Sequence, residues 1–105
     1  MNMTDIHSIE ELKSVLIQNE VNLLYVSNHM CEVCHAVKPK IADILMRNPK
    51  VQGINCETGS VPEVAGQYVI FSVPAVLVFQ GGREVFRSAR FIDFHKLEGI
   101  LKEIR

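Results

Sequence analysis

The sequence predicts an α/β fold in which a central mixed β-sheet is flanked by helices on both faces. Short apolar runs that suit buried strands alternate with segments of helical periodicity. The last two strands are separated by Gly81-Gly82, a two-residue turn that makes the pair antiparallel. With 105 residues, 48% of them hydrophobic, the chain can form one core, so we expect a single domain over residues 1–105.

Local signals predict the first three elements. A short strand is expected near residues 3–6. Ser8-Ile9-Glu10-Glu11 has the capping-box pattern, and the apolar residues after it recur at helical spacing, which predicts a helix over residues 9–19. The apolar run at residues 22–27 then indicates a buried strand.

The middle of the chain predicts a long helix, a strand and a short helix. The long helix is expected over about residues 34–47, kinked at Pro39 because a proline ring removes a backbone donor. Asn48-Pro49 should end this helix. A strand at residues 51–56 and a short helix at residues 61–68 follow.

The last third predicts a hairpin and a final helix. Residues 75–79 are continuously apolar, which indicates a strand buried on both faces. Residues 83–88 should be its antiparallel partner. Asp93 can cap the final helix. Apolar residues of that helix fall on one face: Phe94, Leu97, Leu101 and Ile104.

Composition and charge narrow the class of function. The 11 basic and 12 acidic residues give a net charge of −1, so nucleic acid is not an expected partner. No apolar run approaches the roughly 18–20 residues that span a bilayer, so no membrane association is expected. Three cysteines do not suit a disulfide scaffold, and the first eight residues lack the features of a secretion signal. We therefore expect a cytoplasmic protein.

Cys31-Glu32-Val33-Cys34 is the motif most informative about chemistry. Two cysteines at this spacing lie one helical turn apart, so their sulfurs can form a small disulfide ring. The motif lies between a predicted strand and a predicted helix, where unpaired N–H groups and the helix dipole favour a thiolate. A thiolate is the species that attacks a disulfide, so the leading interpretation is thiol–disulfide exchange.

The chain resembles the thioredoxin family over nearly its whole length. The matching features are the Cys31–Cys34 motif between strand and helix, Pro39 five residues later, and Val73-Pro74 at the position of the family's cis-proline. The resemblance implies a thioredoxin-like fold, with Cys31 as nucleophile and Cys34 as resolving thiol. It also implies disulfide-containing protein substrates and a thioredoxin reductase or small-thiol electron donor. We expect a monomer with no bound cofactor or metal.

The resemblance also implies a substrate groove. Val73 and Pro74 would lie beside the sulfurs, with a cis bond that turns the Val73 backbone toward an extended peptide. Met30 occupies the position that is usually tryptophan, and Arg90 lies near the groove's small glycine. Both are expected to contact substrate. Tyr25 aligns with a buried aspartate of typical thioredoxins, but tyrosine is not a base at neutral pH.

Two more residues are expected to tune the cysteine pair. Glu32 places negative charge next to Cys31 and should disfavour its thiolate. His35, when protonated, would favour the thiolate.

Three other interpretations remain open. His29, Cys31, Cys34 and His35 offer four nitrogen or sulfur donors within seven residues, which suits a zinc or copper carrier. Residues 31–35 also match the CxxCH haem-attachment pattern, although the strands predicted downstream do not suit a haem protein. A redox-silent binding module that uses a groove beside the proline is the third.

The remaining aromatic and thiol side chains are interpreted as structural. Phe71, Phe79 and Phe86 are expected to pack in the core or on the sheet. Cys56 is expected to be a small apolar residue at a strand end. Phe91, next to Arg90, either packs inside or helps to select partners.

Overall fold

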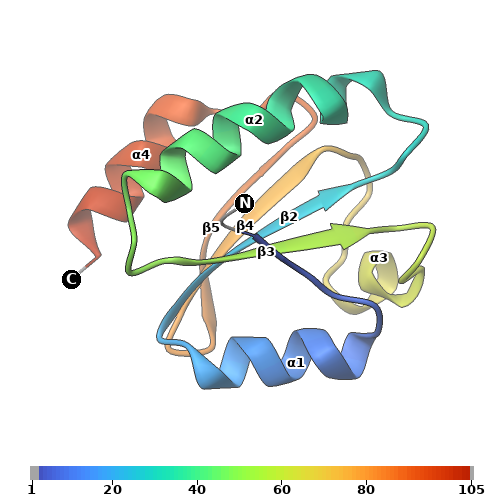
Figure 1. The fold of residues 1–105 in the computed structure, drawn as a ribbon, viewed down its shortest axis with the longest axis horizontal. Coiled ribbons are helices and arrows are strands. Elements are labelled where there is room, and N and C mark those ends of the chain that lie inside the picture. The colour runs from blue at the N-terminus through green and yellow to red at the C-terminus, as the bar shows by residue number, and fades with distance from the viewer. Residues whose placement is uncertain (1–2, 105) are drawn as a thin grey trace.

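The computed structural model describes residues 3–104, which form a five-stranded mixed sheet between two layers of helices (Figure 1). The strands are β1 (Met3–Asp5), β2 (Val21–Ser27), β3 (Gln52–Glu57), β4 (Ala75–Gln80) and β5 (Arg83–Ala89). The helices are α1 (Ile9–Gln18), α2 (Glu32–Met46), α3 (Glu63–Gln67) and α4 (Phe94–Glu103). The predicted fold class and element order are confirmed, and each boundary lies within two residues of its predicted position.

The sheet has the strand order β1-β3-β2-β4-β5. Strands β1, β3 and β2 are parallel, whereas β4 runs antiparallel to β2 and β5 antiparallel to β4. The hairpin between β4 and β5 turns at Gly81 and Gly82, whose φ angles of 59° and 82° are readily adopted by glycine. An irregularity in the β4–β5 register lies between Val78 and Phe79.

Two cores hold the layers together, one on each face of the sheet. Helices α1 and α3 cover one face, and α2 and α4 cover the other (Figure 1). On the first face, Leu12 of α1 and Val64 of α3 belong to a buried cluster that includes Leu77 of β4. On the second face, Ile41 of α2 and Leu97 of α4 belong to another cluster. Residues 21–26 of β2 are all buried, since this strand lies in the middle of the sheet.

The topology brings two loops together at one edge of the sheet. Because β2 and β3 are parallel neighbours, the segments that follow Ser27 and Glu57 leave the sheet at the same edge. The first segment leads into α2 and carries the cysteine motif at its end. Over residues 3–104, no helix is long and apolar enough to cross a membrane.

Candidate redox-active site

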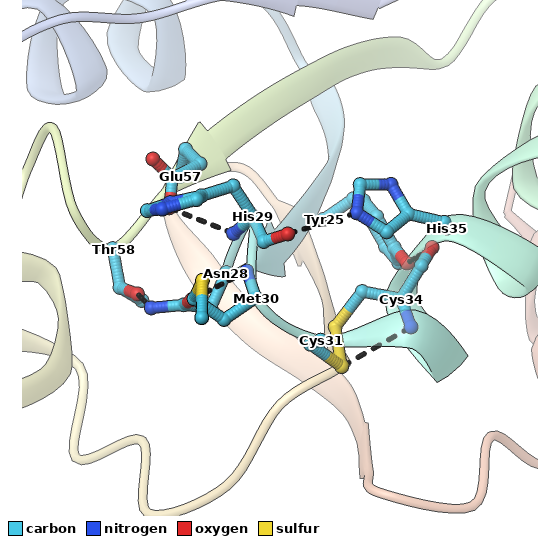
Figure 2. The surroundings of a disulfide bond; sticks show 9 residues. All are labelled: Tyr25, Asn28, His29, Met30, Cys31, Cys34, His35, Glu57 and Thr58. Atoms are coloured by element: carbon cyan, nitrogen blue, oxygen red, sulfur yellow. Dashed lines mark hydrogen bonds and ion pairs between the residues drawn. A yellow bond between two sulfur atoms is a disulfide. The ribbon is translucent and has the colours of Figure 1, made fainter.

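Cys31 and Cys34 form a disulfide at the N-terminus of α2 (Figure 2). Their α-carbons are 5.3 Å apart. Cys31 is the N-cap residue, and its Sγ accepts a hydrogen bond from the backbone N–H of Cys34 at 3.1 Å. The predicted position of Cys31 at a helix N-terminus is therefore confirmed. In the reduced protein the same amide would stabilise negative charge on the Cys31 sulfur.

The two cysteines differ in their access to solvent. Cys31 is half-buried, whereas only 2% of Cys34 is exposed. Cys31 lies at the end of the loop that follows β2, while Cys34 lies inside the first turn of α2 against the sheet. A disulfide that approaches from solvent can therefore reach the sulfur of Cys31 more readily than that of Cys34.

Tyr25 lies beneath the motif on β2. Its hydroxyl donates a hydrogen bond of 2.6 Å to the carbonyl oxygen of Cys34 (Figure 2). The side chain is fully buried, and burial raises the pKa of Tyr25 to about 12. The phenol therefore stays protonated at neutral pH, and its hydrogen bond links the first turn of α2 to the sheet.

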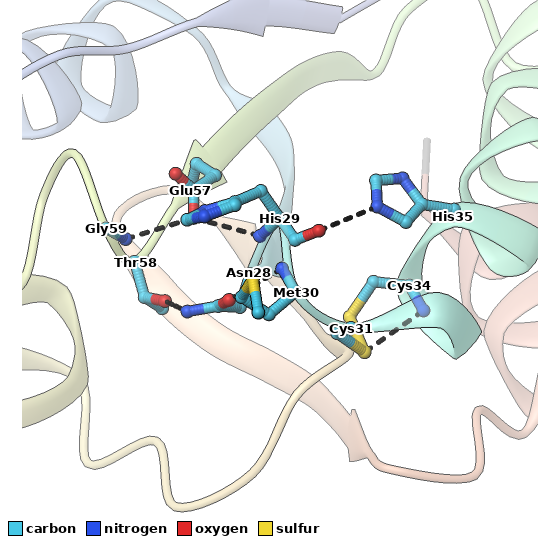
Figure 3. Close-up of polar contacts among 9 residues, drawn as sticks. All are labelled: Asn28, His29, Met30, Cys31, Cys34, His35, Glu57, Thr58 and Gly59. Carbon is cyan, nitrogen blue, oxygen red and sulfur yellow. Dashed lines mark hydrogen bonds and ion pairs between the residues drawn. A yellow bond between two sulfur atoms is a disulfide. The ribbon is translucent and has the colours of Figure 1, made fainter.

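The two predicted tuning residues, Glu32 and His35, differ in their surroundings. The Nε2 atom of His35 lies 3.0 Å from the carbonyl oxygen of His29 (Figure 3). Because a carbonyl oxygen only accepts, this nitrogen carries a proton. Among the hydrogen bonds of residues 3–104, none joins the His35 ring to a cysteine sulfur, so its direct contact is with the preceding loop. Glu32 is exposed in the first turn of α2.

The loop before Cys31 is anchored to the loop after β3. Asn28 donates through Nδ2 to Oγ1 of Thr58 at 2.9 Å, and its Oδ1 accepts from the Met30 amide at 2.9 Å. Oε1 of Glu57 accepts from the backbone amides of His29 at 3.2 Å and Gly59 at 3.0 Å (Figure 3). These donors, first among them the Gly59 amide, lower the pKa of the Glu57 carboxyl from its ordinary value of 4.5.

Sequence reasoning missed this anchor. The signal that could have found it is positional. Asn28 directly follows β2, Thr58 directly follows β3, and the two strands are parallel neighbours. Polar side chains at the carboxyl ends of neighbouring parallel strands meet at one edge of the sheet.

The geometry does not favour the metal-carrier interpretation. Within residues 3–104, no three His, Cys, Asp or Glu side chains are grouped so that they could hold a metal ion. The Nδ1 atom of His29 lies 3.5 Å from Glu57, whereas the His35 ring faces a backbone carbonyl. The two histidines therefore have different partners.

Three of the predicted groove residues, Val73, Pro74 and Arg90, lie in two segments that a hydrogen bond joins. The Val73–Pro74 peptide bond is cis, Pro74 is buried and Val73 is half-buried. The Arg90 amide donates to the carbonyl oxygen of Pro74 at 2.7 Å, and Arg90 has a left-handed φ of 71°. Its guanidinium is exposed and lies 5.8 Å from the ring centroid of Phe91. The position of Pro74 beside the sulfurs stays a prediction.

The aromatic side chains do not all pack as expected. Phe79 is buried, and Phe86 is partly buried against the cluster on the face that α2 and α4 cover. Phe71 is 92% exposed, so its predicted packing role is wrong. Phe71 lies in the connection between α3 and β4, outside the sheet, where no layer covers it. Phe91 is also exposed, as is Met30 at 80%.

A five-stranded mixed sheet with a CxxC pair at the N-terminus of α2 defines a thioredoxin-fold protein of the thiol–disulfide oxidoreductase class. The chain is 36% identical over 102 residues to the thioredoxin-like protein YdfQ of Bacillus subtilis, a match that covers 97% of this chain and 91% of that protein. No protein-family model matches it. The chain therefore belongs to the thioredoxin family as a thioredoxin-like member.

Solved structures agree with the fold. The thioredoxin of Plasmodium falciparum superposes with a TM-score of 0.87 at 21% identity and covers 98% of this chain and 100% of that chain. The thioredoxin of Fasciola hepatica superposes with a TM-score of 0.88 at 18% identity, with the same coverage of both chains.

Proposed function

We propose that the protein reduces disulfides in other proteins through the Cys31–Cys34 dithiol, without a bound cofactor. The observation that carries the proposal is the asymmetry of the pair. The sulfur of Cys31 is the more accessible one and accepts a hydrogen bond from a helix N-terminal amide, whereas Cys34 is buried. An accessible, stabilised thiolate suits the attacking role, and a buried neighbour suits the resolving role.

Reduction would proceed in two exchange steps. The Cys31 thiolate attacks one substrate sulfur, so that a mixed disulfide forms, the substrate disulfide breaks, and the other substrate sulfur leaves as a thiolate that takes a proton from water. Cys34 then loses its proton to water and attacks the Cys31 sulfur. The Cys31–Cys34 bond forms, the mixed disulfide breaks, and the second substrate sulfur leaves as a thiolate that takes a proton from water. Two electrons pass from the dithiol to the substrate.

Met30, Val73, Pro74 and Arg90 are proposed to contact the substrate. Met30 is exposed directly before Cys31. The Arg90 amide donates a hydrogen bond to the Pro74 carbonyl oxygen, so the backbones of Arg90 and Pro74 are close. An extended substrate segment could pair with the backbone of Val73. Glu32 would oppose the Cys31 thiolate by its charge.

The electron donor is proposed to be a thioredoxin reductase or a small thiol, and the compartment the cytoplasm. The small, odd number of cysteines supports a reducing setting, because three cysteines do not suit a disulfide scaffold. The third cysteine, Cys56, is a buried free thiol. Burial, and secondarily the charge of Glu57, raises the pKa of Cys56 to about 11, so this thiol would not compete in exchange. We propose that the protein acts as a monomer, which sedimentation of the reduced and oxidised forms would test.

Trapping experiments test the assignment of roles. Cys31→Ser should abolish reduction of insulin, whereas Cys34→Ser should accumulate mixed disulfides on Cys31. With limiting iodoacetamide, peptide mass spectrometry of the reduced protein should find Cys31 alkylated first. Alkylation of Cys34 before Cys31 would reverse the roles. The potential of the couple against glutathione tests the direction, since about −270 mV indicates a reductant and about −120 to −180 mV an oxidant or isomerase.

A further inference from the structure

Arg87 of β5 reaches across to the end of α3. Its Nη1 donates to the carbonyl oxygen of Val69 at 2.7 Å, and its Nη2 donates to that of Tyr68 at 2.6 Å. These carbonyls follow the last turn of α3, where backbone acceptors have no partner within the helix and a positive charge is favourable. One guanidinium thus binds both carbonyls that flank the α-carbon of Val69.

Glu84 holds the guanidinium in this orientation. Its Oε2 accepts from Nε of Arg87 at 2.9 Å and its Oε1 accepts from Nη2 at 2.8 Å. This arrangement uses the planar fork of arginine, which a lysine ammonium cannot reproduce. The interaction with Glu84 orients Arg87, and the other edge of the guanidinium remains free to bind the Tyr68 and Val69 carbonyls.

The β4–β5 irregularity makes this pairing possible. In a regular strand, residues three apart point to opposite faces. Here Glu84 pairs with Phe79 and Arg87 with Leu77, so three steps along β5 correspond to two along β4. Glu84 and Arg87 therefore lie on the same face as Leu77 and Phe79, the face that α3 covers.

The turn that Arg87 binds is strained. Val69 has a φ of 54°, a left-handed conformation that a β-branched residue rarely adopts. The Ile70 amide donates to the Ala65 carbonyl at 2.8 Å, as in helix endings where glycine is usual at the position of Val69. A valine at this position needs support from elsewhere, and Arg87 bonds the peptide groups on both sides of it.

The supported turn leads directly into the proposed groove. Phe71 follows two residues after Val69, and the Val73–Pro74 bond follows Phe71. Strand β5 and the residue that follows it thus hold residues 69–74 at both ends, through Arg87 at the start and through the Arg90 amide on Pro74 at the end. We propose that Arg87 is a positioning residue that fixes this segment and thereby sets the affinity for protein disulfides. The inference rests on the proposed role of Val73 and Pro74 in substrate binding.

Arg87→Met tests the proposal because it keeps an unbranched side chain but removes every donor. The matched control is Arg47→Met, which breaks another exposed arginine–glutamate pair, the one with Glu98 between α2 and α4. Each reduced protein is assayed on insulin and on a small aromatic disulfide that needs no groove. For Arg87→Met we expect the KM for insulin to rise by about tenfold, with kcat and the small-disulfide rate unchanged within about twofold. Arg87→Lys should recover only part of the affinity.

Two further measurements separate positioning from general damage. Hydrogen exchange of the Ile70 amide should accelerate in Arg87→Met, while that of the Leu24 amide in β2 should not. Adding Val69→Gly should return the KM for insulin toward the wild-type value, because glycine adopts the left-handed turn without support. If Arg87→Met does not fold, Arg87→Lys takes its place in the assays, with a smaller rise in the KM for insulin expected.

The outcomes distinguish the two proposals. An unchanged KM for insulin in Arg87→Met, or a parallel loss of activity on both disulfides, would overturn the positioning role. A failure of Val69→Gly to restore affinity would also count against it. If the wild-type protein reduces neither disulfide, the proposed function itself fails.

Discussion

The hydroxyl of Tyr25 donates to the carbonyl oxygen of Cys34, and this bond joins the central strand β2 to the first turn of α2. In the thioredoxin pattern an aspartate, which can accept a proton, aligns with this position. Here the buried group is a protonated phenol whose hydrogen is already donated to the backbone. In the proposed mechanism, the Cys34 thiol must therefore lose its proton by a route that does not use Tyr25.

Tyr25→Phe should destabilise the fold without removing the redox chemistry. The change deletes the buried hydroxyl, so the Cys34 carbonyl oxygen loses the hydrogen bond from this side chain. The free energy of unfolding should therefore fall by about 1–3 kcal/mol. Urea unfolding of the oxidised protein measures this loss. The pH profile of insulin reduction should keep its shape, and a shift of its acidic limb would mean that Tyr25 does take part in proton transfer.

Glu57→Gln should lose stability in a pH-dependent way. The Glu57 pKa is lowered in the folded protein, chiefly by the Gly59 amide, so the carboxylate stabilises the fold above the ordinary value of 4.5. That contribution is lost as the pH falls through the lowered folded-state pKa. The difference in unfolding free energy between wild type and variant should be largest near neutral pH and shrink below 4.5. A constant difference across this range would contradict the assignment.

Arg90→Gly and Arg90→Ala form a matched pair. Both remove the guanidinium, but only glycine adopts the φ of 71° without a steric penalty. Arg90→Ala should therefore be the less stable of the two, by up to about 1 kcal/mol in thermal or urea unfolding. Both variants should show the same change in KM for a disulfide peptide with acidic flanking residues. Different KM values would indicate that backbone geometry, not the guanidinium, governs binding.

Cys56 should be inert in the native protein. Its side chain is buried and its pKa is raised to about 11, so little thiolate exists at neutral pH. At about pH 7.5, iodoacetamide should label Cys31 of the reduced protein and should spare Cys56 until urea is added. Cys56→Ala should retain full insulin reduction. Rapid native labelling of Cys56 would show that the β3 end opens readily.

Much of the fold could be predicted because its signals are local. Helical spacing, the Ser8 cap and the continuous apolar run of β4 each depend on neighbouring residues, and the structure bears them out. The position of Cys31 at a helix N-terminus followed from the same signals.

What could not be predicted depends on register and on contacts between distant segments. The bonds that join Asn28 to Thr58 and Arg87 to Val69 link residues 30 and 18 positions apart. The face on which Arg87 lies depends on an irregular register that the apolar pattern does not reveal. Phe71 does not pack as predicted, because hydrophobicity alone does not tell whether a connecting segment is covered.

The Gly81-Gly82 turn lies at the end of the sheet opposite the disulfide, because Gln80 pairs with the first residue of β2 whereas the cysteine motif follows the last. It also lies on the far side of the irregular register from Arg87 and Ala89. Residues inserted into this turn would lengthen the hairpin tip without moving the pairing of β5 beside Pro74. The tip is therefore the natural place to attach a fluorophore or affinity tag to a working form of the protein.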